Sequence, residues 1–295
     1  MPKTRLPLAL LALVPLFLIS ADRVAADMTF GVSFTAQAQG DLTAAEQQMF
    51  IDGVNFWDDI IVDHRDLNSR HWELTVNTFS QAASGGSVLL GSAGPGSLAF
   101  SDVVADSHTS NQRFIISTSG NANFNVHPDA GALSFDTIKH EIGHALGFGT
   151  LWEDNEVYND NVAGNSNRTL AGGTPGQYVG AAALDAFQNE FVGQGSAAFV
   201  PVELSFGPGT AHGHWDEEDD FGQSLTGLVT FSGQDMRDEL MTGFASPGTA
   251  FLSNTSRQSM YDIGFIVTAA IPEPGSVALL AIAGLGLISR RRRAA

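Results

Sequence analysis

The sequence of 295 residues contains no cysteine and few basic residues, and both features narrow the possible functions. Without cysteine the chain can form no disulfide, no thiolate zinc site and no cysteine nucleophile. Lysine and arginine number 14 against 32 aspartates and glutamates, which gives a formal net charge of −18. Phosphate binding requires clustered basic side chains, so this balance argues against a nucleic-acid partner. With 43% hydrophobic residues, the chain is expected to form a folded, acidic domain with a sizeable core.

The first 26 residues have the pattern of a secretory signal peptide. Lys3 and Arg5 form a basic start, an apolar run follows over 6–19, and residues 24–26 (Val-Ala-Ala) supply the small side chains that precede cleavage. We expect cleavage at the end of this stretch, with Ala21 as the alternative position. An uncleaved anchor is the other interpretation, although the run is short for a helix that spans a bilayer.

The C-terminus has a three-part pattern. Pro272-Glu273-Pro274 comes first, an apolar stretch follows over 277–288, and four arginines occupy 290–293. A helix of a dozen apolar residues spans roughly 18 Å, less than the hydrocarbon core of about 30 Å. The arginines would stay on the cytoplasmic side. This tail, residues 271–295, resembles the PEP-CTERM sorting signal. The resemblance implies an exosortase-type sorting enzyme as a partner, a transient association with the membrane, and an extracellular or cell-surface location. An ordinary short tail anchor is the alternative.

Between these ends, residues 27–270 are expected to form one α+β domain. A capping box, Thr43-Ala-Ala-Glu46, precedes apolar residues at helical spacing. Alternating hydrophobic residues predict a half-buried strand further on. The expected elements are a helix over 43–62, a strand over 71–79, a Gly/Ser-rich loop or hairpin over 80–96, short strands over 98–105 and 113–118, and a helix over 174–191. Helix, strands and helix in this order favour the α+β class.

The most informative segment is 134–147, with the sequence SFDTIKHEIGHALG. Its first residues include Ser and Asp, which can cap a helix. His140 and His144, four residues apart, would then lie on the same helical face. Two neutral imidazoles with an open water position favour zinc. Glu141 would lie beside the first histidine, able to reach a zinc-bound water without being a ligand.

A catalytic zinc site requires a third protein ligand. The short metzincin pattern would place a histidine where this chain has Thr150, whose neutral hydroxyl is a poor zinc ligand. The third ligand must therefore come from elsewhere. The downstream candidates are Glu153, Asp154, Glu156, Glu190, His212 and His214.

Several blocks of the chain have the order of conserved blocks in a known family. Residues 140–152 have the sequence HEIGHALGFGTLW, and a later region contains VPVE, GPGT and then His214-Trp215. The segment 238–244 (DELMTGF) looks like a Met-turn, and 256–265 looks like the helix that closes the domain. Over about 134–265 the chain resembles the leishmanolysin family, metzincins in which a long insertion precedes the third histidine.

This resemblance implies a metzincin-like zinc protease fold: an N-terminal twisted sheet with two long helices and a more irregular C-terminal subdomain. The insertion between the second and third zinc ligands would cover about 151–213, and 223–237 looks inserted relative to the family. By resemblance, Glu141 would be the catalytic base and Met241 the hydrophobic floor beneath the metal. The residues implied to hold Zn²⁺ are His140, His144 and His214.

Two alternatives for the third ligand remain open. His212 is the rival to His214, because Gly213 between them could turn either imidazole inward. A glutamate ligand, as in gluzincins, is the other.

The remaining polar clusters have less specific patterns. His127 and Asp129 could bind a second metal but are more typical of a polar turn. The acidic run 216–220 and the Asp/Asn-rich loop 154–167 could bind calcium, although neither has EF-hand spacing. The other histidines are expected to be surface or strand residues; they are His64, His71 and His108.

We therefore expect a secreted or surface-sorted zinc endopeptidase that acts on proteins or peptides. Glu141 would take a proton from a zinc-activated water and pass it to the departing amine. The alternative is a surface or extracellular-matrix protein with a structural zinc site, which would be closed by four protein ligands. Hydrolysis of a non-peptide amide by the same residues is a third possibility.

Overall fold

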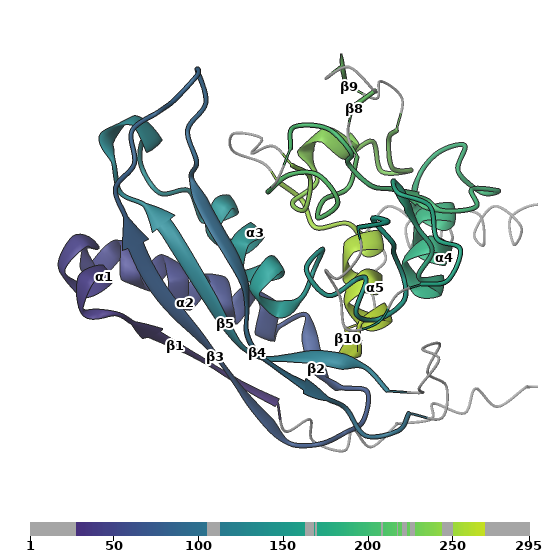
Figure 1. Cartoon of the computed structure of the whole chain (residues 1–295), viewed down its shortest axis with the longest axis horizontal. Coiled ribbons are helices and arrows are strands. Elements are labelled where there is room, and N and C mark those ends of the chain that lie inside the picture. Colours follow the sequence, from purple (N-terminus) through teal and green to yellow (C-terminus); the bar gives the residue numbers. More distant parts are fainter. Residues whose placement is uncertain are drawn as a thin grey trace, which may run out of the picture.

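The structure, a computed structural model, has a mixed α/β architecture (Figure 1). It describes residues 28–104, 113–162, 168, 170–207, 209–216, 218–219, 223–224, 228–243 and 250–268. The predicted signal peptide (1–26), the predicted sorting signal (271–295) and His108 lie outside the described residues.

A four-stranded sheet forms one layer of the molecule, with strand order β1-β3-β5-β4. The strands are β1 (Met28–Phe34), β3 (Arg70–Phe79), β5 (Ile115–Asn125) and β4 (Gly91–Phe100). The first three run parallel, and β4 pairs with β5 in the antiparallel sense, so that β4 forms one edge. Alternate residues of β3 are buried, which confirms the strand predicted over 71–79.

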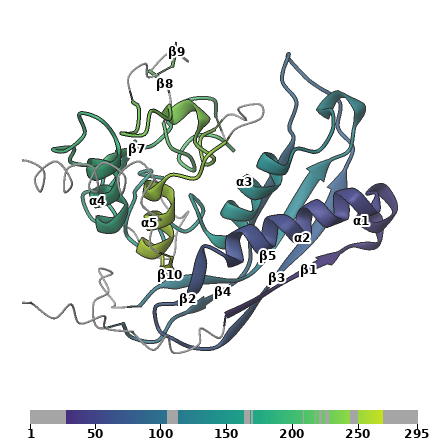
Figure 2. The ribbon, with the colours of Figure 1, turned by 180° about the vertical axis from the view of Figure 1, so that it is seen from behind.

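Two helices, α2 (Ala44–Asp58) and α3 (Phe135–Leu146), cover one face of this sheet (Figures 1 and 2). The short helix α1 (Ala36–Asp41) connects β1 to α2. The predicted capping box is present: Thr43 accepts a hydrogen bond from the Glu46 amide, and the Glu46 carboxylate accepts one from the Thr43 amide. The indole of the fully buried Trp57 donates to the Lys139 carbonyl across 2.8 Å, which ties α2 to α3.

The remaining part of the chain is more irregular and lies beyond the C-terminal end of α3 (Figure 1). Its helices α4 (Ala181–Glu190) and α5 (Asn254–Asp262) pack against each other. The strand β10 (Phe265–Val267) pairs with β2 (Ile61–His64) and so joins the C-terminal part to the first half. The short elements are η1 (Pro128–Ala130), β6 (Gln177–Tyr178), β7 (Val200–Pro201), β8 (Glu218–Asp219), β9 (Gln223–Ser224) and η2 (Met236–Asp238). Within the described residues, no helix combines the length and the apolar character that crossing a bilayer requires.

The helix predicted over 43–62 is too long. It ends at Asp58, and after a short turn Ile61 enters β2, where it is buried and pairs with Val267 of β10. The predicted helix over 174–191 begins only at Ala181, because the preceding residues turn and then form β6. In both cases pairing with a distant strand replaces the local helical preference.

The strand boundaries near the Gly/Ser-rich region also differ from the prediction. Residues 91–96, within the region predicted as a loop or hairpin, belong to β4, and this strand ends at Phe100 instead of continuing to 105. An edge strand can accommodate Pro95 and several glycines, and its register shifts after Pro95. The strand predicted over 113–118 is β5, which begins at Ile115 and continues to Asn125.

Candidate metal centre

Helix α3 brings two of the predicted residues together. His140 and His144 are one turn apart, with ring centroids separated by 4.6 Å. The apolar residues Ile138, Ile142 and Leu146 are fully buried on the side of the helix that packs in the core. This burial fixes the rotation of α3 about its axis, and the histidine face is left toward the C-terminal part of the chain.

His214 reaches the same place from a distant segment. Its carbonyl accepts a hydrogen bond from the Glu203 amide at 3.0 Å, and the amide of the next residue, Trp215, donates to the Met241 carbonyl at 3.1 Å. The backbones of Gly149 and Gly213 also touch: a Cβ added to Gly149 would lie 2.2 Å from the Gly213 carbonyl oxygen. This close approach holds the segment that carries His214 against the end of α3.

The three imidazoles converge through their Nε2 atoms. The Nε2–Nε2 distances are 3.0 Å for His140–His144, 2.9 Å for His144–His214 and 3.1 Å for His140–His214. Each Nδ1 lies within hydrogen-bond distance of a backbone carbonyl. These pairs are His140 with Leu240 at 2.7 Å, His144 with Phe148 at 2.9 Å, and His214 with Thr210 at 2.8 Å.

These contacts determine the tautomer of all three rings. A carbonyl can only accept, so each Nδ1 carries the proton and each neutral ring presents an unprotonated Nε2. Burial lowers the pKa of His140 and His144, and lowers the pKa of His214 to about 3, so all three rings are neutral at physiological pH. Three nitrogen lone pairs therefore face one another at about 3 Å, a repulsive arrangement that a shared cation would stabilise.

The donor set fits a zinc ion. Nitrogens bound tetrahedrally to zinc at about 2.0–2.1 Å are about 3.3 Å apart, close to the spacing of these Nε2 atoms. Ligating histidines commonly donate their other N–H to a carbonyl, as all three rings do. Among the described residues, these three histidines are the only group of potential ligands close enough together to hold one metal ion.

Glu141 lies beside this group. Its side chain is 7% exposed, and burial raises the pKa of its carboxyl to about 8. Two cavities of about 450 and 530 Å³ both include Glu141, His140 and His214 in their lining. The smaller cavity also includes His144, so Glu141 and the three rings border open space between β4 and the C-terminal part of the chain.

Met241 is not a member of the histidine cluster and packs instead against α3, the helix that carries His140 and His144. Its side chain is fully buried against Gly143 of α3: a Cβ on Gly143 would lie 2.8 Å from the Met241 Cε and 2.9 Å from its Sδ. The turn that carries Met241 is held by Glu239, which the sequence prediction did not single out. Four donors converge on its carboxylate, namely the amide of Met241 (2.5 Å), the amide and hydroxyl of Ser253 (2.9 Å each) and the hydroxyl of Ser256 (2.7 Å).

The structure does not bring the rival ligands to the three histidines. His212 points instead to Tyr158, whose hydroxyl lies 2.7 Å from its Nδ1. Glu190 accepts hydrogen bonds from the first turn of α5, including the amides of Asn254 and Thr255. Glu153 accepts a hydrogen bond from the Asp160 amide, and it lines the smaller cavity without joining the cluster. Asp154 and Glu156 also lie outside the cluster.

The remaining polar predictions have local structural explanations. His127 and Asp129 form the polar turn at η1, with the Asp129 amide donating to the His127 Nδ1. His64 and His71 are strand residues: His64 is buried in β2 and His71 lies in β3. Part of 154–167 and most side chains of 216–220 lie outside the described residues, so the calcium alternative stays a prediction. In the segment 223–237, which looked inserted from the sequence, residues 228–237 lie at the C-terminal end of α4, where the Phe231 amide donates to the Glu190 carbonyl.

Comparison with known families finds one match. Residues 270–293 match the PEP-CTERM protein-sorting motif, which agrees with the tail pattern and indicates export with membrane-associated sorting by an exosortase-type enzyme. No curated protein matches the chain.

Proposed function

We propose that this chain is an exported zinc-dependent endopeptidase whose metal is held by His140, His144 and His214, with Glu141 as the general base. The observation that carries the proposal is the convergence of three unprotonated Nε2 atoms beside a buried carboxyl group and two open cavities. The leishmanolysin-like order of motifs and the sheet-and-helix layout of the first half are consistent with a metzincin-like fold, which is part of the same proposal.

A zinc ion held here would supply a Lewis acid that polarises a peptide carbonyl and acidifies a water molecule. The carboxylate of Glu141 would take the proton from that water and deliver it to the amide nitrogen that leaves. Positive charge at the three histidines would lower the pKa of Glu141 from about 8 toward the range in which a base works at neutral pH. Met241 and the three backbone carbonyls would keep the imidazoles in place.

The number of ligands in the cluster also helps to choose between a catalytic and a structural zinc site. A structural site is closed by four protein ligands, and within the described residues the cluster contains three. The cavities that border the cluster would leave room for water and a peptide. Both observations favour a catalytic role.

The proposal is tested by the Glu141→Gln variant of the exported protein. The variant is expected to retain stoichiometric zinc by elemental analysis and to lose casein hydrolysis, because the amide cannot accept the proton. Glu46→Gln is the matched control: Glu46 is in the exposed capping box of α2, where glutamine also serves. A chelator should abolish hydrolysis and added zinc should restore it. Undiminished turnover by Glu141→Gln would refute the assignment.

A further inference from the structure

A histidine–tyrosine pair, His212 and Tyr158, borders the proposed metal centre. The Tyr158 hydroxyl lies 2.7 Å from the Nδ1 of His212 and accepts a hydrogen bond from the Gly176 amide at 3.1 Å. Tyr158 is 1% exposed, and among the described residues these are the two polar partners of its hydroxyl. The amide of Gly176 is a donor, so the phenol proton has one acceptor, the Nδ1 of His212. Neutral His212 therefore carries its proton on Nε2.

The Nε2–H of His212 is available to a ligand. Among the described residues this atom has no hydrogen-bond partner. His212 lines the cavity of about 450 Å³ that also contains the three site histidines and Glu141. The residue that carries this N–H donor thus borders the space in which the proposed reaction would occur.

The backbone at His212 supports a role for its side chain. His212 has φ of 69°, in the left-handed region that glycine occupies without strain. Its amide donates to the Glu203 carbonyl at 2.7 Å, and the Glu203 amide donates to the His214 carbonyl, so the conformation is held on both sides. Keeping a non-glycine residue in this region costs about 1–2 kcal/mol, and such strain tends to cluster at functional sites.

We propose that His212 is a further catalytic residue of the proposed peptidase, donating its Nε2–H to the carbonyl oxygen of the peptide bond that is hydrolysed. Negative charge develops on this oxygen as water adds to the carbonyl carbon. A preoriented donor stabilises that charge more than it stabilises the bound substrate. Tyr158 is a positioning residue, because its hydroxyl holds the ring and places the proton on Nε2. The inference rests on the proposed function, since it assigns a role within the same site.

The test uses His212→Gly and His212→Asn in the exported protein, with turnover of a quenched fluorescent peptide as the readout. Glycine fits φ of 69° without strain, so this variant is expected to fold and to retain zinc. We expect its kcat to fall about 10²-fold with KM changed by less than about threefold, the signature of a lost transition-state contact. Asparagine also tolerates this conformation and keeps an N–H donor, so it should recover part of kcat.

Tyr158→Phe tests the positioning role. It should lower kcat by a smaller factor than His212→Gly, and it should have no further effect when combined with His212→Gly, because the ring that it positions is then absent. His71→Leu, in β3, is the control for a histidine outside the site.

The outcomes separate the two proposals. An inactive wild-type protein with bound zinc would overturn the proposed function itself. An active wild type, together with a zinc-loaded His212→Gly that has unchanged kcat or a change in KM alone, would overturn only the role of His212. Loss of zinc from His212→Gly would also overturn it, because His212 would then be needed to build the metal centre rather than to contact substrate.

Discussion

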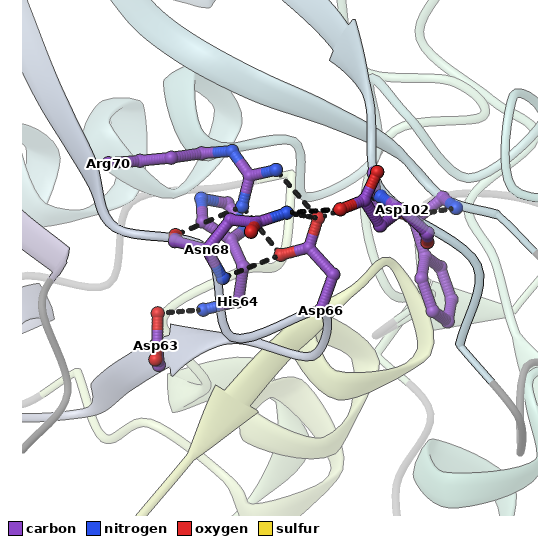
Figure 3. Close-up of polar contacts among 8 residues, drawn as sticks. Asp63, His64, Asp66, Asn68, Arg70 and Asp102 are labelled. Atoms are coloured by element: carbon purple, nitrogen blue, oxygen red, sulfur yellow. Dashed lines mark hydrogen bonds and ion pairs between the residues drawn. The ribbon is translucent and has the colours of Figure 1, made fainter. Parts of the chain in front are cut away.

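We expect His64, which lines neither cavity at the candidate metal centre, to make the fold sensitive to acid. The side chain is 1% exposed in β2, and its ring stacks on Phe265 of β10 at 4.8 Å. Among the residues that the structure describes, neither ring nitrogen has a hydrogen-bond partner. Figure 3 shows the ring beside Arg70 and Asp66, which form an ion pair with an N–O distance of 2.6 Å. Burial, and to a smaller extent the charge of Arg70, lower the pKa of His64 to about 4, although the charge of Asp66 opposes both.

The sign and size of the effect follow from this pKa. In the unfolded chain the imidazole binds a proton below about pH 6.5, whereas in the folded protein it does so only near pH 4. The unfolded state therefore binds more protons in this window, and stability falls as the pH is lowered from 6.5 to 4. The difference between the two pKa values, at about 1.4 kcal/mol for each pH unit, corresponds to a loss of about 3 kcal/mol.

The assay is urea denaturation at pH 7 and pH 4.5, in wild type, His64→Phe and His64→Gln. The wild type should lose about 2–3 kcal/mol more than either variant over this interval, since neither replacement titrates. Comparing proteins cancels the contribution of the site histidines. Glutamine should cost stability at pH 7, because its buried amide has no partner, while phenylalanine preserves the stacking. An equal loss of stability in all three proteins between the two pH values would refute this role of His64.

Three further predictions concern the metal centre. Glu239→Ala should lower the free energy of unfolding by about 3 kcal/mol in urea denaturation, because four donors lose their acceptor; a change below about 1 kcal/mol would contradict this. Gly149→Ala should reduce bound zinc in elemental analysis, since its Cβ would collide with Gly213. Gly85→Ala is the control, because Gly85 has a similar φ of 63° and no described atom would lie within 4 Å of an added Cβ; equal zinc in both variants would count against the close approach. Chelation should lower the melting temperature in calorimetry, and zinc but not magnesium should restore it; insensitivity to chelation would contradict the site.

The parts of the fold predicted correctly are those with a strong local signal. The capping box of α2, the alternation in β3 and the helix around His140 each depend on residues close together in sequence. The prediction failed where a distant partner decides the structure. The strand β2 interrupts a helical pattern because β10 pairs with it, and β4 contains a proline and glycines that would indicate a loop but are tolerated at a sheet edge.

The residues of the candidate site likewise include some with a local sequence signal and some without one. Residues 140–144 were recognisable from their spacing, whereas Glu239 had no signal of its own, because its role depends on Ser253 and Ser256, which approach only in the folded chain. Tyr158 was missed for the same reason: its partner His212 is 54 positions away.

The choice between His212 and His214 shows which information the sequence lacks. In an extended segment, the side chains of residues i and i+2, such as His212 and His214, would point to the same side of the backbone. The left-handed conformation at His212 breaks this alternation, so that His212 turns to Tyr158 and His214 turns to α3. Glycine adopts this conformation far more readily than histidine, so the sequence would favour a left-handed residue at Gly213, one position later. Gly213 instead allows a close backbone contact, because it lies against the backbone of Gly149. The candidate ligand is thus selected by one backbone angle and one glycine contact, both of which depend on the tertiary structure.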